Sequence, residues 1–363
     1  MIKINFPAIL CCLGAIATCS LSGCTAAVPY ALSAAQIVAS GGATEQYGNT
    51  PAQTPQTSQI SQANRMDDSK ERAAAARPYQ LIAEQKYDEA LPLLREQADQ
   101  NDAKAQGQIG RMYFEGKGVP QDYHKAAEWI RKAAEGGHPA SQYMLAWFYY
   151  KGIGVPQEYV TSAAWAQQSS DKGDVDASNL LGVLYRTGRG VPKDYSKALA
   201  CFHEADRYGN REAPAHIASM YKSGQGVAKD YRQAINWYSK AAEKGNDAGW
   251  IHLAYLYATC RDTQYVDNQK AVAYALKGTE KEPDNFASWA ALAAAYARNN
   301  QFALAIETAM QSDTLLQADR HLDEAERQAA MARAQARLAA YKEGKAYTEV
   351  SEEEDLYIMF GSF

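Results

Sequence analysis

Apolar residues in the middle of the chain recur at helical spacing in two successive stripes. Ile109 and Tyr113 lie one helical turn apart, so they share one face of a predicted helix. Ala126, Trp129 and Ala133 follow at helical intervals and form the stripe of a second predicted helix. The pattern therefore predicts a pair of amphipathic helices joined by a short segment.

Small residues suit the joint between these two helices. Gly116 fits the left-handed position that ends the first helix, because glycine has no Cβ. Gly118 permits the turn, Val119 can reach the core, and Asp122 can cap the amides that open the second helix. Gly110, on the first helix, is small enough for a neighbouring helix to pack closely.

The whole pattern returns with a period of 36 residues. The Gly-x-Gly loop begins at Gly116, Gly152, Gly188 and Gly224. The aromatic residue before each loop recurs in phase as Tyr113, Tyr149, Tyr185 and Tyr221. A fixed period of this length is typical of solenoids, in which each unit packs only on its neighbours. The sequence therefore predicts an all-α fold, an α-solenoid of antiparallel helix pairs.

With its loop, cap and both helix faces, the pattern from Ala105 to Gly137 resembles the Sel-one-like repeat, a relative of the tetratricopeptide repeat. The regular repeats cover residues 103–246. The resemblance implies that the first helices line the concave face of the array, and that a protein partner binds there.

The flanks of the regular array resemble plain tetratricopeptide repeats. A helix rich in Ala, Arg and Glu, expected from about Asp319 to Tyr341, would cover the open end of the solenoid. The predicted organisation is a signal peptide (1–23), a lipidated low-complexity tether (24–67), an N-terminal tetratricopeptide-like helix pair (68–102), four Sel-one-like repeats (103–246), a degenerate fifth repeat with a tetratricopeptide-like repeat (247–318), a capping helix (319–345) and an acidic-then-apolar tail (346–363).

The N-terminus has the features of a secretory signal peptide. Lys3 supplies a positive charge, and the apolar run 4–17 that follows is too short to span a bilayer comfortably. The run leads to Leu-Ser-Gly-Cys24, which resembles the bacterial lipobox and implies cleavage before Cys24 and lipidation of its sulfur. An ordinary signal peptide that happens to contain Cys24 is the alternative. Because Thr25 is not Asp, the resemblance implies the periplasmic leaflet of the outer membrane.

The charge of the chain argues against nucleic acid as a partner. The formal net charge is −5, which gives no basic footprint for nucleic acid, so we expect no direct role on DNA or RNA. Residues 25–67 are poor in charge and rich in small polar residues, which predicts a flexible tether. A short helix at the lipid surface over residues 28–39 is an alternative for part of that segment.

The motifs that could carry chemistry are weak. The Gly-x-Gly loops close helices in an all-helical pattern, whereas phosphate loops open a helix after a strand. Ser-x-x-Lys occurs at Ser219–Lys222 and Ser169–Lys172, without the other elements of penicillin-recognising enzymes. The six histidines show no metal-ligand spacing, so we regard them as incidental. We expect no enzyme activity, no cofactor and no metal.

Two cysteines, Cys201 and Cys260, remain after the predicted cleavage and lipidation. Cys201 falls in phase with Trp129, Trp165 and Trp237, so we expect a small buried apolar group. The two sulfurs belong to repeats that should be too far apart for a disulfide, although the pairing is left open. Some secreted proteins with this repeat, described as penicillin-binding or weakly β-lactamase-like, carry a cysteine pair in each repeat. Here that framework is absent.

The resemblance also carries ligand-facing positions onto the first helix of each repeat. They are Lys104, Gly107, Arg111 and Phe114; Ala140, Tyr143, Trp147 and Tyr150; Asp176, Asn179, Val183 and Arg186; and Glu212, Ala215, Ser219 and Lys222. Aromatic and Arg clusters are typical of binding hot spots. The predicted partner-binding residues are Arg111, Phe114, Tyr143, Trp147, Tyr150, Asn179 and Arg186. The alternative is that these aromatics pack between adjacent helices.

The last twelve residues change from acidic, at Glu352–Asp355, to apolar. We expect this segment to pack on the array or to serve as a peptide ligand for another protein. Together these features predict an outer-membrane-anchored periplasmic scaffold that binds protein partners of the cell envelope. The alternatives are an enzyme acting on cell-wall or β-lactam substrates and a surface-exposed protein that binds host molecules.

Overall fold

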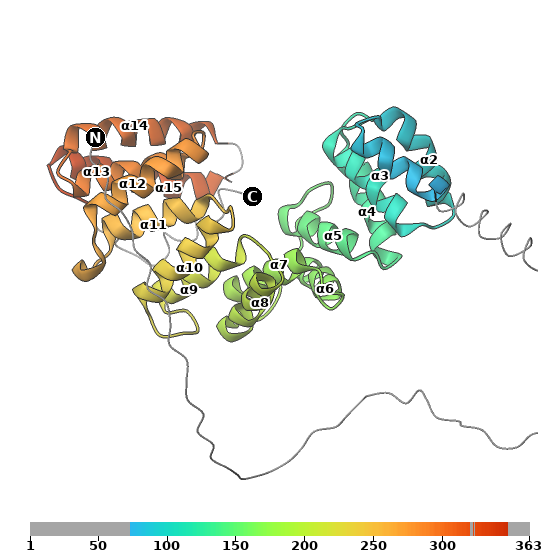
Figure 1. The fold of residues 1–363 in the computed structure, drawn as a ribbon, viewed down its shortest axis with the longest axis horizontal. Coiled ribbons are helices and arrows are strands. Elements are labelled where there is room, and N and C mark those ends of the chain that lie inside the picture. The colour runs from blue at the N-terminus through green and yellow to red at the C-terminus, as the bar shows by residue number, and fades with distance from the viewer. Residues whose placement is uncertain (1–72, 320–321, 323, 348–363) are drawn as a thin grey trace, which may run out of the picture. The chain divides into compact units, whose positions relative to one another are not determined.

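The computed structural model describes residues 73–319, 322 and 324–347 (Figure 1). Within these residues the regular secondary structure is entirely helical, which confirms the predicted all-α class. None of the helices described there is long and apolar enough to cross a membrane. The predicted signal peptide, lipid attachment at Cys24 and tether lie outside the described residues, as does the tail beyond residue 347.

The helices follow one another as antiparallel pairs. A helix over residues 73–83 precedes α2 (Tyr87–Asp99). The pairs that follow are α3 (Ala103–Glu115) with α4 (Tyr123–Glu135), α5 (Pro139–Lys151) with α6 (Tyr159–Ser170), α7 (Val175–Thr187) with α8 (Tyr195–Arg207), α9 (Ala213–Ser223) with α10 (Tyr231–Glu243), α11 (Ala248–Thr259) with α12 (Asn268–Lys281), and α13 (Phe286–Arg298) with α14 (Phe302–Ala318). A short 3-10 helix, η1 (Thr263–Tyr265), joins α11 to α12, and α15 (Glu324–Lys342) follows α14.

Packing runs from each pair to the next. Each first helix contacts its own second helix, and that second helix contacts the first helix of the following pair. First helices also contact one another directly, as α5 does with α7 and α11 does with α13. This nearest-neighbour arrangement confirms the predicted α-solenoid.

Complementary sizes set the contact within each pair. Ile109 is fully buried, and a Cβ added to Gly110 would lie 2.7 Å from Ile130 Cγ1 of α4. Gly110 is therefore small because the partner helix needs its space, as the sequence predicts. Ala126 and Ala133 of the predicted α4 stripe are fully buried, but Trp129 is only partly buried and its neighbour Ile130 fills the core.

The same correction applies to Cys201. It shares the phase of Trp129 and is partly exposed, while the next residue, Phe202, is fully buried. The helical stripe is therefore centred one residue further along than the tryptophans suggest. Cys201 and Cys260 are both free thiols, in agreement with the expectation that they are too far apart to pair.

The loops confirm the predicted turn chemistry. Gly116 ends α3 with φ of 70°, in the left-handed region. The carboxylate of Asp122 accepts a hydrogen bond from the Lys125 amide at 3.0 Å and caps α4. Asp194 and Asp230 cap α8 and α10 in the same way. Glu158, at the equivalent position before α6, makes no such side-chain bond.

The C-terminal end differs from the prediction at one boundary. Asp319 ends α14 in an extended conformation, so α15 begins at Glu324 and not near Asp319. Ala334 and Tyr341 of α15 are buried, and the helix packs on α14. Tyr341 thereby covers part of the apolar surface of the α13–α14 pair.

Candidate partner-binding site

A small pocket of about 30 Å³ opens on the first helices of three consecutive repeats. We call it the aromatic pocket. Its lining residues are Tyr143, Trp147, Tyr150 and Lys151 of α5, Asp176, Asn179, Leu180 and Val183 of α7, and Glu212 before α9. Most of these positions are the ones that the repeat phase assigns to the ligand-facing side. The structure therefore brings together Tyr143, Trp147, Tyr150 and Asn179 of the predicted site.

The aromatic side chains of α5 pack against neighbouring helices and also line the pocket. The Trp147 ring meets the Phe114 ring of the preceding repeat edge-on, with 5.8 Å between centroids and an interplanar angle of 82°. Tyr150 is 6% exposed and its ring contacts that of Tyr159. Tyr143 and Trp147 are half-buried. Both interpretations of the aromatic stripe thus apply, since these rings pack between helices and also line the pocket.

Carboxylates form the opposite side of the pocket. Asn179 Nδ2 donates to Glu212 Oε2 at 3.3 Å, and Asn210 Nδ2 donates to Asp176 Oδ1 at 2.8 Å. Asn179 is 5% exposed, and its carbonyl oxygen Oδ1 accepts no hydrogen bond from any described residue. A buried carbonyl oxygen without a donor is costly, so Asn179 contributes an unused acceptor beside the pocket.

The pKa values around this pocket reflect burial beside negative charge. Burial raises the pKa of Tyr143, and the nearby carboxylates of Asp176 and Glu212 raise it further. Burial also raises the pKa of Glu212, with a further increase from Asp176 and a partial offset from Arg211. Burial is therefore the main cause of both pKa shifts, and the neighbouring carboxylates add to it.

Three predicted residues lie elsewhere. Arg111 is exposed and forms an ion pair with Glu115 at 2.7 Å. Arg186 is buried and donates to Ser219 Oγ at 3.4 Å. Phe114 lies behind Trp147 and supports it without lining the pocket. Partner binding at any of the predicted residues stays a prediction.

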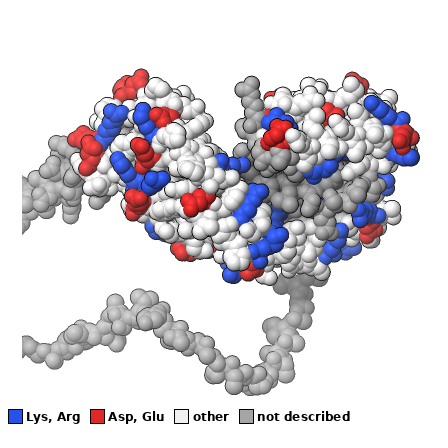
Figure 2. Space-filling view, turned by 180° about the vertical axis from the view of Figure 1, so that it is seen from behind, with Lys and Arg blue, Asp and Glu red and all other residues white. Residues whose placement is uncertain are grey.

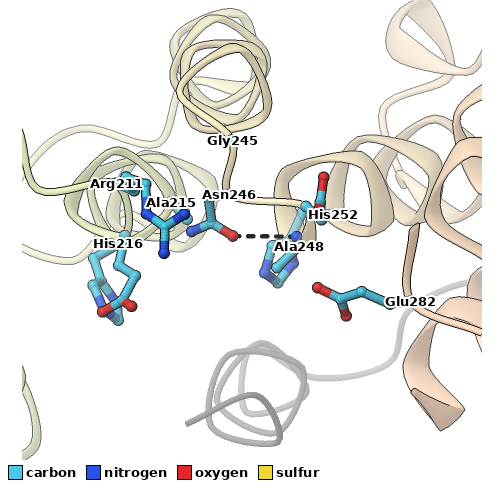
Figure 3. Close-up of a pocket in the computed structure, with 10 residues that line it drawn as sticks. Arg211, Ala215, His216, Gly245, Asn246, Ala248, His252 and Glu282 are labelled. Atoms are coloured by element: carbon cyan, nitrogen blue, oxygen red, sulfur yellow. Dashed lines mark hydrogen bonds between the residues drawn. The ribbon is translucent and has the colours of Figure 1, made fainter. Parts of the chain in front are cut away.

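A second cavity, of about 250 Å³, lies where α9 and α11 begin (Figure 3). We call it the polar cavity. Its lining residues are Arg211, Glu212, Ala215, His216, Gly245, Asn246, Asp247, Ala248, His252 and Glu282. Asn246 Oδ1 accepts a hydrogen bond from the Ala248 amide at 3.1 Å, which fixes the first turn of α11. Glu212 lines both the polar cavity and the aromatic pocket, so the two adjoin through one carboxylate.

His216 and His252 are residues that the sequence analysis did not single out. The His216 ring stacks on Phe202 and the His252 ring on Tyr238, each with 4.7 Å between centroids. Burial lowers the pKa of His216, and Arg186 and His252 lower it further. The two histidines are one repeat apart, and this shared phase is the signal that could have found them. No cluster of ligands suited to a metal ion occurs within the part of the chain that the structure describes.

The Ser-x-x-Lys motifs do not form the expected nucleophile-and-base contact. Ser169 Oγ donates to the Pro139 carbonyl, whereas Lys172 Nζ donates to the Gly137 carbonyl. In the other motif, Ser219 Oγ accepts from Arg186, and the Lys222 ammonium lies 5.7 Å from the centroid of the Tyr255 ring. The serines and lysines of both motifs thus contact groups outside their own motif.

The family model of the Sel1 repeat matches residues 103–138, 139–174, 175–205 and 213–246. The chain carries four Sel1 repeats. The Sel1 match omits residues 206–212, a segment that includes Arg211 and Glu212 of the polar cavity.

Solved structures of other Sel1-type proteins resemble this chain. A Sel1 repeat protein from Oxalobacter formigenes is 27% identical, with a TM-score of 0.56 over 64% of this chain and 96% of that one. The protective antigen c5321 from uropathogenic Escherichia coli is 24% identical, with a TM-score of 0.42 over 76% of this chain and 64% of that one. Helicobacter pylori cysteine rich protein B is 24% identical, with a TM-score of 0.28 over 33% and 91%. A comparison with proteins of curated function gives no match.

Sel1-repeat solenoids typically act as scaffolds for protein–protein interactions and are generally non-catalytic. The match to this repeat agrees with the helix pairs and the glycine loops over residues 103–246.

Proposed function

We propose that this protein is an outer-membrane-anchored periplasmic scaffold that holds a protein partner on its first helices and assists assembly of an envelope complex. One observation carries the binding part of this proposal. Tyr143, Trp147 and Asn179, which the repeat phase assigns to the ligand-facing side, line a single pocket.

The chemistry of this pocket suits a protein surface. Aromatic side chains that are fixed by their neighbours bind with little loss of conformational freedom. Phe114 fixes Trp147 from behind, and Tyr159 fixes Tyr150. A partner side chain that enters the pocket therefore meets rings that are already in position.

The binding role can be tested by affinity capture with the Trp147→Ala variant. We expect this variant to lose most of the partner recovered from solubilised membranes by the wild-type protein, as quantified by mass spectrometry. Tyr208→Ala is the matched control, because Tyr208 is 64% exposed and lies outside the pocket. Thermal unfolding of both variants separates binding from folding. Equal capture by a folded Trp147→Ala variant would contradict the proposal.

The anchoring role rests on the lipobox-like sequence that ends at Cys24. Cys24→Ser should abolish incorporation of an alkyne-labelled fatty acid, because the sulfur that would carry the lipid is absent. Density-gradient separation of the two membranes then tests the outer-membrane assignment. Labelled protein in the inner-membrane fraction would show that assignment to be wrong.

A further inference from the structure

We propose that the aromatic pocket and the polar cavity together bind a lysine- or arginine-bearing segment of the partner protein. This inference rests on the proposed scaffold function and adds the chemical class of the segment. The two sites share Glu212, so an extended segment can contact both.

The first argument is the charge of the lining. Four carboxylates line the two sites, namely Asp176, Glu212, Asp247 and Glu282, whereas the cations are Lys151 and Arg211. In Figure 3, Glu282 and His252 project from one side of the polar cavity and Arg211 and His216 from the other. Charges of both signs are mixed over the face drawn in Figure 2. The carboxylates outnumber the cations at the paired sites, and this favours a cation there.

The second argument is the aromatic wall. Ammonium and guanidinium groups are attracted to the faces of Tyr and Trp rings. This chain already places Lys151 Nζ 5.8 Å from the centroid of the Tyr150 ring, beside the pocket. Tyr143 and Trp147 extend the same wall. Rings beside carboxylates form the combination that holds a cation and excludes an anion.

The third argument is independent of charge. Asn179 lines the aromatic pocket; its buried Oδ1 accepts no hydrogen bond from the described residues, while the Nδ2 of the same amide donates to Glu212. A ligand at this point must therefore supply a donor. Lysine and arginine side chains carry only donors, so they satisfy the amide oxygen and the carboxylates at once.

Buried carboxylates are a fourth indication. Burial raises the pKa values of Glu212 and Glu282. Asp176 raises that of Glu212 further with a partial offset from Arg211, and at Glu282 a hydrogen bond from Asn285 offsets part of the rise while Asp247 adds to it. A cation between these groups relieves their repulsion and stabilises the charged form. An acidic ligand would add to the repulsion.

The test uses the purified full-length chain and three fluorescein-labelled ten-residue peptides. Each has a Gly-Ser backbone, with two lysines, two glutamines or two glutamates at the same two positions. We expect the lysine peptide to bind at least about tenfold more tightly than the glutamine peptide in fluorescence anisotropy, since tenfold corresponds to a single good charge contact. Raising the salt concentration should weaken the binding of the lysine peptide, because screening shortens the range of charge interactions.

Matched variants locate the binding. Glu212→Gln removes the shared carboxylate with little change in shape. It should lower the affinity for the lysine peptide roughly threefold to tenfold. Glu135→Gln, an exposed residue at the end of α4, is the control and should leave the affinity unchanged. Thermal unfolding checks that both variants are folded.

The outcomes separate this inference from the scaffold proposal. Equal or tighter binding of the glutamate peptide would overturn the cation preference, as would an unchanged affinity of Glu212→Gln for the lysine peptide. If Trp147→Ala still lowers partner capture in either case, the scaffold function stands and only the class of segment is wrong. If Trp147→Ala leaves capture unchanged, the scaffold function itself fails.

Discussion

Single residues in this protein are matched in size across each helix pair. A Cβ added to Gly182 would lie 2.5 Å from Cε1 of Phe202, the large buried side chain of α8. In the repeat before, small residues occupy both places, at Ala146 and Ala166. The contact between the two helices of a pair is therefore filled by side chains of different sizes in different repeats.

Gly182→Ala should destabilise the protein by about 1–3 kcal/mol, because the added methyl group overpacks the contact with Phe202. Alanine is the better helix former by about 1 kcal/mol, so intrinsic propensity alone predicts the opposite sign. Urea unfolding measures the difference. In a Phe202→Ala background the same substitution should become neutral or stabilising, and additive effects in this double-mutant cycle would contradict the packing explanation.

Between elements, a charged cluster ties α8 to α10 of the next repeat. Asp206 of α8 is 9% exposed and forms ion pairs with Lys240 at 2.7 Å and Lys244 at 2.8 Å. Burial of the Asp206 carboxyl opposes ionisation, but the two lysines outweigh it and hold its pKa below the ordinary value. The cluster therefore stabilises the junction only while Asp206 is charged.

Asp206→Asn should lower the free energy of unfolding at neutral pH by about 1–3 kcal/mol, because one carboxylate serves both lysines. A lowered folded-state pKa gives stability that is present above the unfolded value of about 3.9 and is lost as the pH falls through the folded-state value. The difference between wild type and variant should therefore be constant from neutral pH to about pH 5 and should shrink below about pH 4. A difference that persists in strong acid would rule out the ionic explanation.

Across the whole described array, stability depends on contacts between neighbours and on the covering of its ends. Tyr341 of α15 is 1% exposed and belongs to a cluster with Ala297 and Ala305. This cluster is separate from the one that contains Ile130 and Leu145 near the other end. Loss of packing at one end should therefore destabilise mainly the adjacent helices.

Tyr341→Ala should cost about 3–5 kcal/mol locally, as expected for a large buried side chain. Hydrogen exchange should accelerate in α13, α14 and α15 and should remain unchanged in α3 to α6. Uniform acceleration over all helices would show that the array unfolds as one unit.

The fold could be predicted from the sequence to a large extent, because each 36-residue repeat contains the same signals for a helix pair, a glycine turn and a cap. The burial of individual residues was harder. Trp129 and Cys201 share a phase that looks central to the stripe, yet the neighbouring Ile130 and Phe202 fill the core. A stripe one residue off centre keeps the same period, so periodicity alone does not detect the shift.

The candidate site was predicted only in part for a similar reason. Phase places Tyr143, Trp147 and Asn179 on one side of the first helices, and the structure gathers them into one pocket. Arg111 has the same phase, but Glu115 on its own helix pairs with it. The polar cavity was not predicted, although Glu212 has the ligand-facing phase, because Arg211, Asn246 and Glu282 lie at positions that this phase does not assign.

Glu212, as the carboxylate common to two sites, has a consequence for how a partner is selected. Two cationic side chains that enter the two sites must share its single negative charge, so the second contact gains less than the first. Recognition of this kind is graded, because losing either contact leaves the other one stronger. A scaffold built this way distinguishes its partners by the spacing of their positive charges and tolerates variation in the residues between them.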